Sequence, residues 1–462
     1  MIDVLVAGGG PAGLATAVNA ALAGMSVVVV EPRASPVDKA CGEGLMPTGV
    51  AALHALGVHP AGHPLRGIRY LDPHRHADAP FRAGPGLGVR RTCLHAALTA
   101  RAAALGVRVV QGKVTGVRQG PDSVEAQVRT LRTTLPRGTA AMDGTQGRNI
   151  AEILVDAGTI GTSSTIGTAV TTGIDARTIG TASTIDVDAR TVGNASTVGG
   201  NASTVDNAST TDHVTADNAS TTGNATTDNA STTDNTSTMD NAKTMGDAET
   251  ETFRARWLVA ADGLRSPLRD MLGLGLPEGA AARRYGLRRH YRVAPWTDFV
   301  EVHWAARSEA YVTPVADDLV GVAVLGSERR TYDEHLSAFP ALLARLTGPA
   351  ATSVRGAGPM RRRVRSRVSG RVLLVGDAAG YLDALTGEGV SLALLSAEAL
   401  VAALRAGHPE SYDRAWLRLS RTHRLLTGAL LAARRHPAPA RLIVPGARAL
   451  PRVFSAAVNA LA

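Results

Sequence analysis

The apolar positions at the start of the chain follow a strand–helix–strand pattern. Val4–Ala7 is a short apolar run that predicts a buried strand. Residues 12–23 have the apolar spacing of a helix, and Gly24 supplies a helix end. Ser26–Val30 is a second, almost continuous apolar run, which is typical of a strand buried on both faces. The chain therefore opens as an α/β unit with a parallel sheet.

The remaining pattern predicts a second sheet of a different kind. A helix is expected at 94–105, with strands at 107–111, 114–118 and 253–260. Alternating stretches, typical of antiparallel strands, follow at 290–293, 299–304, 310–314 and 319–325. A buried strand at 371–375 and helices at 390–405 and within 412–434 complete the pattern. We therefore predict an α/β fold: a Rossmann-like domain with a parallel sheet, plus an antiparallel-sheet domain.

A long segment interrupts this pattern. From about residue 130 to 250 the chain consists of Thr, Ala, Asn, Ser, Asp and Gly, in a repeat such as Val205-Asp-Asn-Ala-Ser-Thr. One aliphatic residue per unit would suit a β-solenoid. The later, fully polar copies favour a disordered low-complexity insertion instead. Because the sequences on both sides belong to one fold, we expect a passenger segment, that is, an insertion in a loop that the fold does not need.

Composition and charge exclude several classes of protein. The chain has 462 residues and a formal charge of +9, but its arginines are spread along it and aromatic residues make up only 3%, which argues against a nucleic-acid partner. Two cysteines exclude a disulfide scaffold, and His74, His76 and Asp78 suit a polar strand edge or a turn better than a metal site. We find neither a membrane-spanning run nor a signal peptide and expect a cytoplasmic protein.

The strongest motif is Gly8-Gly9-Gly10-Pro11-Ala12-Gly13, between the first strand and helix. Gly8 allows a tight turn, Gly10 lets the backbone approach a pyrophosphate, and Gly13 lets helix and strand pack closely. The phosphates would lie at the helix N-terminus. Glu31 ends the second strand, where a carboxylate accepts hydrogen bonds from a ribose diol. The pattern predicts dinucleotide binding, and the neighbouring candidates at this end are Ala12 and Arg33.

Two further motifs carry a resemblance to a known family. Asp262-Gly263 follows a predicted strand, and Gly376-Asp377 follows another. With these, the chain resembles the para-hydroxybenzoate hydroxylase-like FAD-dependent oxidoreductases, which include the geranylgeranyl reductases. The resemblance covers everything except the insertion and implies FAD as cofactor and NAD(P)H as reductant. It also implies that the Asp262 motif shapes the cofactor cleft and that Asp377 binds the ribityl chain.

The same resemblance implies further site residues. Gly387 and Gly389 would lie near the flavin pyrimidine ring, where the following helix N-terminus would stabilise negative charge. Arg91 matches an Arg/Gln-x-x-Leu signature, with Arg90 as the alternative. Cys41 and Gly42 lie in a loop that resembles the one passing the isoalloxazine in reductase-like members; Cys41 is either reactive or a small buried thiol.

The resemblance also implies a substrate side and a domain order. Its antiparallel sheet forms the roof over the substrate, so His303, Trp304 and Tyr311 either face the substrate or are core or surface residues. The C-terminal residues 441–462 suit short amphipathic helices broken near Pro445 and Pro451, which cover the flavin domain or contact a membrane surface reversibly. The expected parts are FAD-binding segments 1–129, 251–284 and 369–410, insertion 130–250, substrate domain 285–368 and C-terminal helices 411–462.

Three functions follow from this reading. The first is an FAD-dependent monooxygenase that uses NAD(P)H and O2 to hydroxylate an aromatic polyketide or a phenolic, including lipidic, small molecule. The second is a reductase of isoprenoid double bonds, favoured by the loop at residues 41–44. The third is a non-enzymatic binding or surface-display protein whose repeat is the functional part. The sequence leaves open the substrate, the choice between NADH and NADPH, and the oligomeric state.

Overall fold

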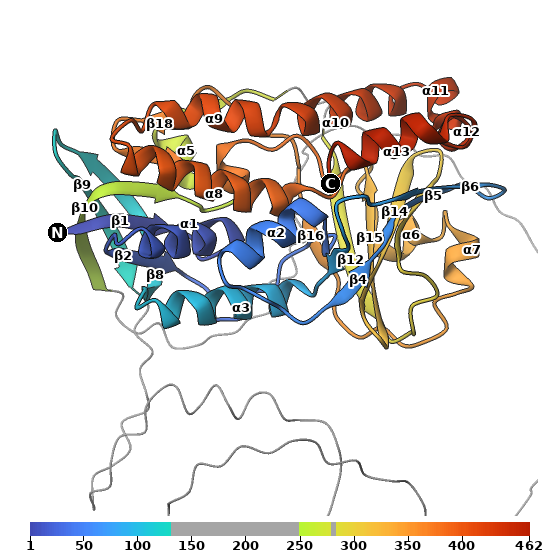
Figure 1. The fold of residues 1–462 in the computed structure, drawn as a ribbon, viewed down its shortest axis with the longest axis horizontal. Coiled ribbons are helices and arrows are strands. Elements are labelled where there is room, and N and C mark those ends of the chain that lie inside the picture. The colour runs from blue at the N-terminus through green and yellow to red at the C-terminus, as the bar shows by residue number, and fades with distance from the viewer. Residues whose placement is uncertain (131–248, 279–282) are drawn as a thin grey trace, which may run out of the picture. The chain divides into compact units, whose positions relative to one another are not determined.

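The first layer of the fold is a seven-stranded sheet (Figure 1). The computed structural model describes residues 1–130, 249–278 and 283–462, so nearly all of the predicted repeat lies outside the described residues. The strands of this sheet are β1 (Ile2–Ala7), β2 (Val27–Glu31), β8 (Arg108–Gln119), β9 (Val124–Thr130), β10 (Glu249–Ala260), β18 (Val368–Ser369) and β19 (Val372–Leu374).

The centre of this sheet is parallel, as the sequence predicts. β1 pairs in parallel with β2 and β10, β10 with β19, and β2 with β8. Their valines and leucines are buried because helices cover the sheet, including α1 (Pro11–Leu22), α3 (Arg91–Ala104) and α8 (Gly389–Arg405). The carboxyl ends of β1, β10 and β19 therefore meet at one edge, which positions the residues that follow them.

β8, β9 and β10 differ from the predicted strands. The sequence predicts two strands at 107–111 and 114–118, but the structure has one strand, β8, with an irregularity between Val114 and Gly116. It stays continuous because its first part pairs with β2 and its second part with β9. β9 and β10 form an antiparallel pair in which Thr130 lies opposite Glu249. The two ends of the insertion are thus neighbours in register.

The second layer is a seven-stranded sheet that is antiparallel except for one pairing, β13 with β5. This sheet contains more of the chain than the predicted substrate domain, residues 285–368. Two of its strands come from residues 67–80, which the sequence analysis assigned to the first FAD-binding segment. β5 joins this sheet by pairing with β13, and β6 joins it by pairing with β5. The strands are β5 (Gly67–Leu71), β6 (His76–Pro80), β12 (Tyr285–Tyr291), β13 (Phe299–Trp304), β14 (Ser308–Ala316), β15 (Leu319–Gly326) and β16 (Arg355–Ala357).

Helices at the C-terminus run along both layers (Figure 1). They are α9 (Ser411–Leu419), α10 (Arg421–Arg434), α11 (Pro437–Arg441), α12 (Ile443–Ala449) and α13 (Pro451–Asn459). The chain breaks at Pro451 as predicted, but Pro445 lies in the first turn of α12, where a missing backbone N–H costs no helical hydrogen bond. Among the described residues, no helix is long and apolar enough to cross a bilayer.

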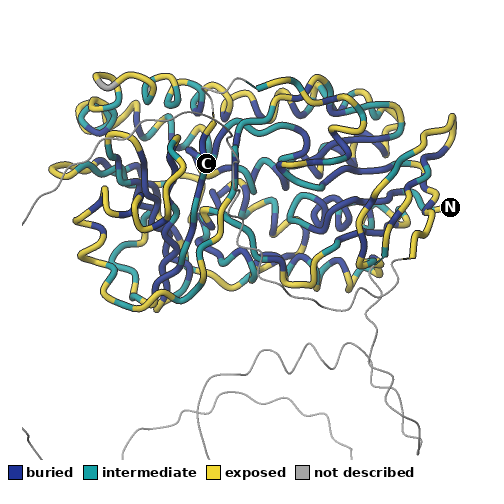
Figure 2. The backbone as a smooth tube through the Cα atoms, turned by 180° about the vertical axis from the view of Figure 1, so that it is seen from behind, coloured by how far each residue is buried: buried dark blue, intermediate teal, exposed yellow. Residues whose placement is uncertain are grey.

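The smaller elements connect these layers. Near the N-terminal segments they are β3 (Gly44–Leu45), α2 (Pro47–Ala55), β4 (His63–Leu65) and β7 (Gly86–Gly88). Further along they are α5 (Pro267–Met271), β11 (Gly275–Leu276), α6 (Tyr332–Leu336), α7 (Pro340–Leu343) and β17 (Arg363–Val364). Figure 2 shows the strands of both layers as largely buried, with exposed residues concentrated on helices and loops.

Candidate functional site

A cavity of about 500 Å³ brings together motifs that are far apart in the sequence. Gly10 follows β1, Asp262 follows β10, and Gly376 and Asp377 follow β19; all four line the cavity. Because β1, β10 and β19 are parallel neighbours, their carboxyl ends open on the same side of the sheet. Ligands of open α/β sheets bind at such an edge.

The glycines of the first motif have separate tasks. Gly8 has a positive φ of 113°, and a Cβ on Gly13 would lie 1.9 Å from the carbonyl oxygen of Gly8. Neither lines the cavity, so these two serve the turn and the close packing of α1 on β1. A Cβ on Gly10 would meet only Nη2 of Arg91, at 3.7 Å. Gly10 therefore leaves open space toward the cavity, as a phosphate would require.

Glu31 is occupied by contacts within the protein. Its Oε2 accepts a hydrogen bond from the Gly9 N–H at 2.7 Å, and its Oε1 accepts one from Arg33 Nε at 2.7 Å. Burial raises the pKa of Glu31, but Arg33 and the Gly9 N–H outweigh it and hold that pKa below its usual range. Glu31 does not line the cavity, whereas Arg33 does. The carboxylate thus holds the glycine turn and orients Arg33.

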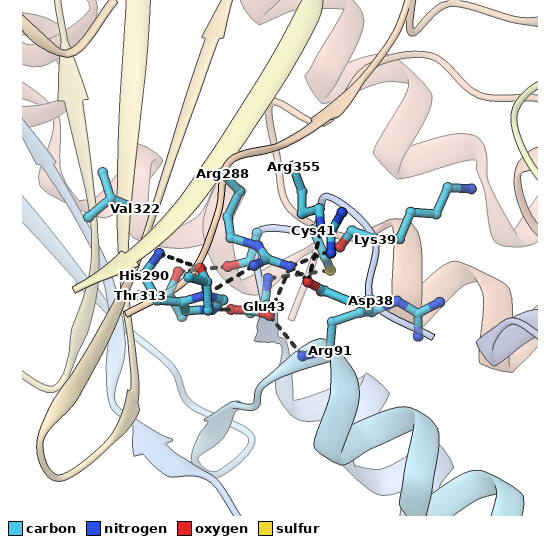
Figure 3. Close-up of polar contacts among 12 residues, drawn as sticks. Asp38, Lys39, Cys41, Glu43, Arg91, Arg288, His290, Thr313, Val322 and Arg355 are labelled. Atoms are coloured by element: carbon cyan, nitrogen blue, oxygen red, sulfur yellow. Dashed lines mark hydrogen bonds and ion pairs between the residues drawn. The ribbon is translucent and has the colours of Figure 1, made fainter. Parts of the chain in front are cut away.

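Glu43 organises the loop beside the cavity, a role that no sequence motif predicts (Figure 3). It is buried between Gly42 and Gly44, which both line the cavity. Its Oε1 accepts a hydrogen bond from the backbone N–H of Arg91 at 2.8 Å, and its Oε2 lies 2.5 Å from Nε2 of His290. The carboxylate therefore joins this loop to the start of α3 and to β12.

The partners of Glu43 form a buried polar cluster (Figure 3). Arg288 Nη1 lies 3.0 Å from His290 Nδ1. Because a guanidinium only donates, Nδ1 accepts, and the proton of a neutral His290 ring is then on Nε2, facing Glu43. Arg288 also donates to Asp38 at 2.5 Å and lines the cavity. These contacts couple residues 38–43 to the second sheet.

Arg91 and Cys41 both line the cavity. The Arg91 side chain is buried, its Nη1 has no hydrogen-bond partner among the described residues, and burial lowers its pKa. A buried guanidinium with a free donor beside Gly10 suits an anionic ligand. Burial raises the pKa of the Cys41 thiol, so the thiol stays neutral near pH 7.

The other candidates of the flavin motifs also reach the cavity. The lining includes Ala12, Gly42, Gly263, Gly387 and Gly389. A Cβ on Gly387, whose φ is 72°, would meet no atom within 4 Å, so the turn before α8 opens onto free space. Burial raises the pKa of Asp262, whose Oδ2 accepts the backbone N–H of Leu268 at 3.0 Å.

The structure separates the candidates on the substrate side. Tyr311 lines the cavity, and its hydroxyl donates to the carbonyl of Leu385 at 2.7 Å. His303 is not brought to the cavity: Val300 and Val302 line it, so strand alternation turns His303 to the opposite face of β13. There its Nε2 lies 3.1 Å from Glu301 Oε2. Trp304 packs in the core against Tyr70, with ring centroids 5.2 Å apart.

The far end of the cavity is apolar. α13 contributes Phe454, Ala457 and Val458, which have helical spacing, and Leu461 follows the helix. α10 contributes Leu426, Ala429 and Leu430. The second sheet supplies Ile68, Tyr70, Val302 and Leu325. This end therefore suits a hydrocarbon group.

The described part of the chain contains no candidate metal site. No group of three or more His, Cys, Asp and Glu side chains that could hold a metal ion occurs among those residues. Asp78, a weak candidate from the sequence, instead receives hydrogen bonds from Nε and Nη2 of Arg69, both at 2.8 Å.

Comparisons with known proteins agree with this geometry. A family model described as "FAD binding domain" matches residues 1–137 and 157–428. A 56-residue segment is 54% identical to the menaquinone reductase of Mycobacterium tuberculosis (strain ATCC 25618 / H37Rv), covering 12% of this chain and 14% of that protein. The corresponding identity to the menaquinone reductase of Mycolicibacterium smegmatis (strain ATCC 700084 / mc(2)155) is 57%, with the same coverage. The chain thus matches about one seventh of the length of these curated relatives.

Solved structures share the fold at low sequence identity. The flavin-dependent brominase Bmp2 has a TM-score of 0.63 and 14% identity, covering 99% of this chain and 93% of that one. A flavoprotein/dehydrogenase from Cytophaga hutchinsonii has a TM-score of 0.59 and 16% identity, covering 94% and 87%. The halogenase PltM in complex with phloroglucinol and FAD has a TM-score of 0.57 and 14% identity, covering 94% and 76%.

Proposed function

Because this chain belongs to the FAD binding domain family, we propose that it is an FAD-dependent oxidoreductase, and specifically a monooxygenase acting on a phenolic molecule with an apolar side chain, using NAD(P)H and O2. One observation carries the proposal: a single cavity contains both the flavin-motif residues and an apolar end. Such an enclosure excludes water from a reaction in which reduced cofactor meets an apolar substrate.

The described residues fit FAD. Open space at Gly10 and the N-terminus of α1 suit the pyrophosphate, and the unpartnered Nη1 of Arg91 supplies a buried positive charge. Asp377 would hold the ribityl chain, and the open turn at Gly387 would hold the pyrimidine edge. When bound, FAD supplies electron transfer and reaction with O2.

The chain's own residues orient the substrate and control its charge. Lys39 lines the cavity beside the Cys41 loop. A nearby cation favours the ionised form of a phenol, whose ring is richer in electrons than that of the neutral form. Tyr311 is fixed by its bond to Leu385, so its ring forms a rigid wall rather than a mobile acid or base.

The apolar end supports an extended substrate. A ring held beside the cofactor would leave its side chain room along the apolar residues of the cavity, which include Ala457 and Val458 of α13. Burying each methylene group of such a chain contributes about 0.8 kcal/mol. A phenolic lipid or alkylated aromatic polyketide fits this enclosure better than a small polar phenol does.

A second candidate is reduction of an isoprenoid double bond. The segment shared with the menaquinone reductases favours it, and the apolar end of the cavity suits an isoprenoid chain equally well. The two candidates differ in their products, because hydroxylation adds one oxygen atom and reduction adds two hydrogen atoms.

The test is to incubate the purified FAD-loaded protein with NADPH or NADH, air and a series of alkylphenols or a polyprenyl quinone. Substrate-dependent oxidation of the nicotinamide, with a product one oxygen heavier, is expected from the alkylphenols. A product gained only from the quinone, and still two hydrogens heavier after its ring is re-oxidised to the quinone, would replace the first candidate by the second. No product from either substrate class would reject both.

A matched pair of variants tests the apolar end. Ala457 lines the cavity, whereas Ala456 on the same helix is exposed. Ala457→Trp should raise KM for long-chain phenols and leave KM for short-chain phenols nearly unchanged. Ala456→Trp should change neither value; equal effects of both variants would show that the tail does not bind there.

A further inference from the structure

The C-terminal helices carry an unusual charge. Residues 414–462 contain nine arginines and no aspartate or glutamate. Eight of these arginines are exposed, and none of the eight forms an ion pair with another described residue. Two of them, Arg414 and Arg418, lie on α9, and the other six lie on α10 to α13 or at the ends of these helices. These six are Arg421, Arg424, Arg435, Arg441, Arg448 and Arg452.

The same helices also expose large apolar side chains. Leu425 and Leu442 are 63% exposed, Val453 is 62% and Leu450 is 59%. Among the described residues, only Met1 at the chain terminus is a more exposed large hydrophobic residue. Exposed leucines set among unpaired arginines are typical of helices that lie in the interface of an anionic membrane.

These helices are also a wall of the cavity. Leu426 lines the cavity beside the exposed Leu425 on α10, and Phe454 lines it beside the exposed Val453 on α13. Figure 1 shows α10 to α13 together at one end of the molecule, over the second sheet. One face of these helices therefore encloses the apolar end of the cavity while residues next to it are open to solvent.

We propose that α10–α13 form a docking surface for an anionic lipid bilayer, through which the apolar end of the cavity meets the membrane. The bilayer is favoured over a nucleic acid because leucine and valine, not stacking aromatics, are exposed between the arginines. The role of the surface in loading a lipid substrate rests on the function proposed above. Binding of the surface to a bilayer does not depend on that function.

The experiment is flotation of the full-length FAD-loaded protein with vesicles. Vesicles of phosphatidylglycerol and phosphatidylcholine should carry the protein upward, whereas vesicles of phosphatidylcholine alone should not. Leu442→Asp with Val453→Asp should lower the partition coefficient at least about tenfold, since each removes an inserted apolar side chain. Arg441→Gln should lower it about fivefold and reduce its dependence on salt.

Matched controls keep this result interpretable. Leu22→Asp changes an exposed leucine on α1, outside the docking surface, and should leave flotation unchanged. Visible flavin absorbance and melting temperature should be the same in all variants. Vesicle binding without turnover would support the docking surface while rejecting the proposed function, so the two failures are distinguishable.

Several outcomes would overturn the docking proposal. These are no binding to anionic vesicles, binding unaffected by the leucine and valine substitutions, and binding to a DNA oligonucleotide in place of vesicles. Residues 131–248 contain thirteen acidic and six basic residues, so this segment is the competing occupant. Flotation that occurs only after deletion of 131–248 would assign the surface to the chain's own insertion instead.

Discussion

Substitution of Glu43 is the sharpest test of which contacts hold the loop beside the cavity in place. It is the only non-glycine residue with positive φ in the described part of the chain, at 60°. That conformation costs about 1–2 kcal/mol in a residue with a side chain. Glycine adopts a positive φ without this cost, and it already occupies both neighbouring positions, Gly42 and Gly44. The side chain must therefore stabilise the fold by more than the strain it brings, which Glu43→Gly tests directly.

The magnitude follows from the contacts. Without the carboxylate, the N–H of Arg91 and the Nε2–H of His290 lose their buried acceptor, at about 1–3 kcal/mol each. Relief of the backbone strain returns about 1–2 kcal/mol. With the middle value of each range, Glu43→Gly should therefore destabilise the protein by a net of about 2–3 kcal/mol. Glu43→Gln keeps the strain and offers one carbonyl to two donors, so it should cost about 2 kcal/mol or more.

The assay is urea unfolding of the FAD-loaded protein, combined with the flavin absorbance spectrum and the FAD dissociation constant. Because Gly42 and Gly44 line the cavity, movement of this loop should shift the flavin spectrum as well as stability. Glu398→Gln, an exposed change on α8, is the control and should alter the free energy of unfolding by less than about 0.5 kcal/mol. If Glu43→Gly unfolds at the same or higher urea concentration than the wild type, the positioning argument is refuted.

Three other predictions follow from the site. Gly10→Val should abolish FAD binding but, compared in the FAD-free state, should change the melting temperature little, because the side chain enters open space. Gly13→Ala should lower the melting temperature of the FAD-free protein, because its Cβ meets the Gly8 carbonyl; equal melting temperatures of the two FAD-free variants would contradict this. At pH 8 the exposed Cys93 should react with maleimide first, and Cys41 should react only slowly because its raised pKa leaves less thiolate. Removal of FAD should accelerate the reaction of Cys41 alone. Mass spectrometry of the labelled peptides measures both reactions. Replacing 131–248 with a short glycine-containing turn should leave the flavin bound, since the flanking strands are already paired in register, and a colourless product would refute the passenger interpretation.

The parts of the site that the sequence predicted are local. A turn that follows an apolar strand, as at Gly10 or Asp377, is set by residues within a few positions of it. Its place in space then follows from the rule that parallel strands end at a common edge. This is why Gly10, Asp262 and Asp377 could be assigned to one cleft from the sequence, and why the structure has all three lining one cavity.

The parts that the sequence did not predict depend on distant pairing. Glu43 and His290 are 247 positions apart, and neither belongs to a motif that names the other. The pairing of β5 with β13 likewise joins segments more than 200 residues apart, so residues 67–80 could not be assigned to the second sheet. His303 illustrates a different limit: alternation along β13 was recognisable, but which of its two faces meets the cavity was not.

The position of the insertion explains how the fold can contain it. The chain leaves at Thr130 and returns at Glu249, which begins β10, whereas Asp262 follows the other end of the same strand. β10 has twelve residues, and an extended strand rises about 3.3 Å per residue, so the attachment point lies about 40 Å along the strand from the cavity. Between them, β10 is held by β9 on its first half and by β1 and β19 on its second. A change in the number of repeats therefore alters only the connection between two paired strand ends, and the carboxyl edge that carries Asp262 keeps its register.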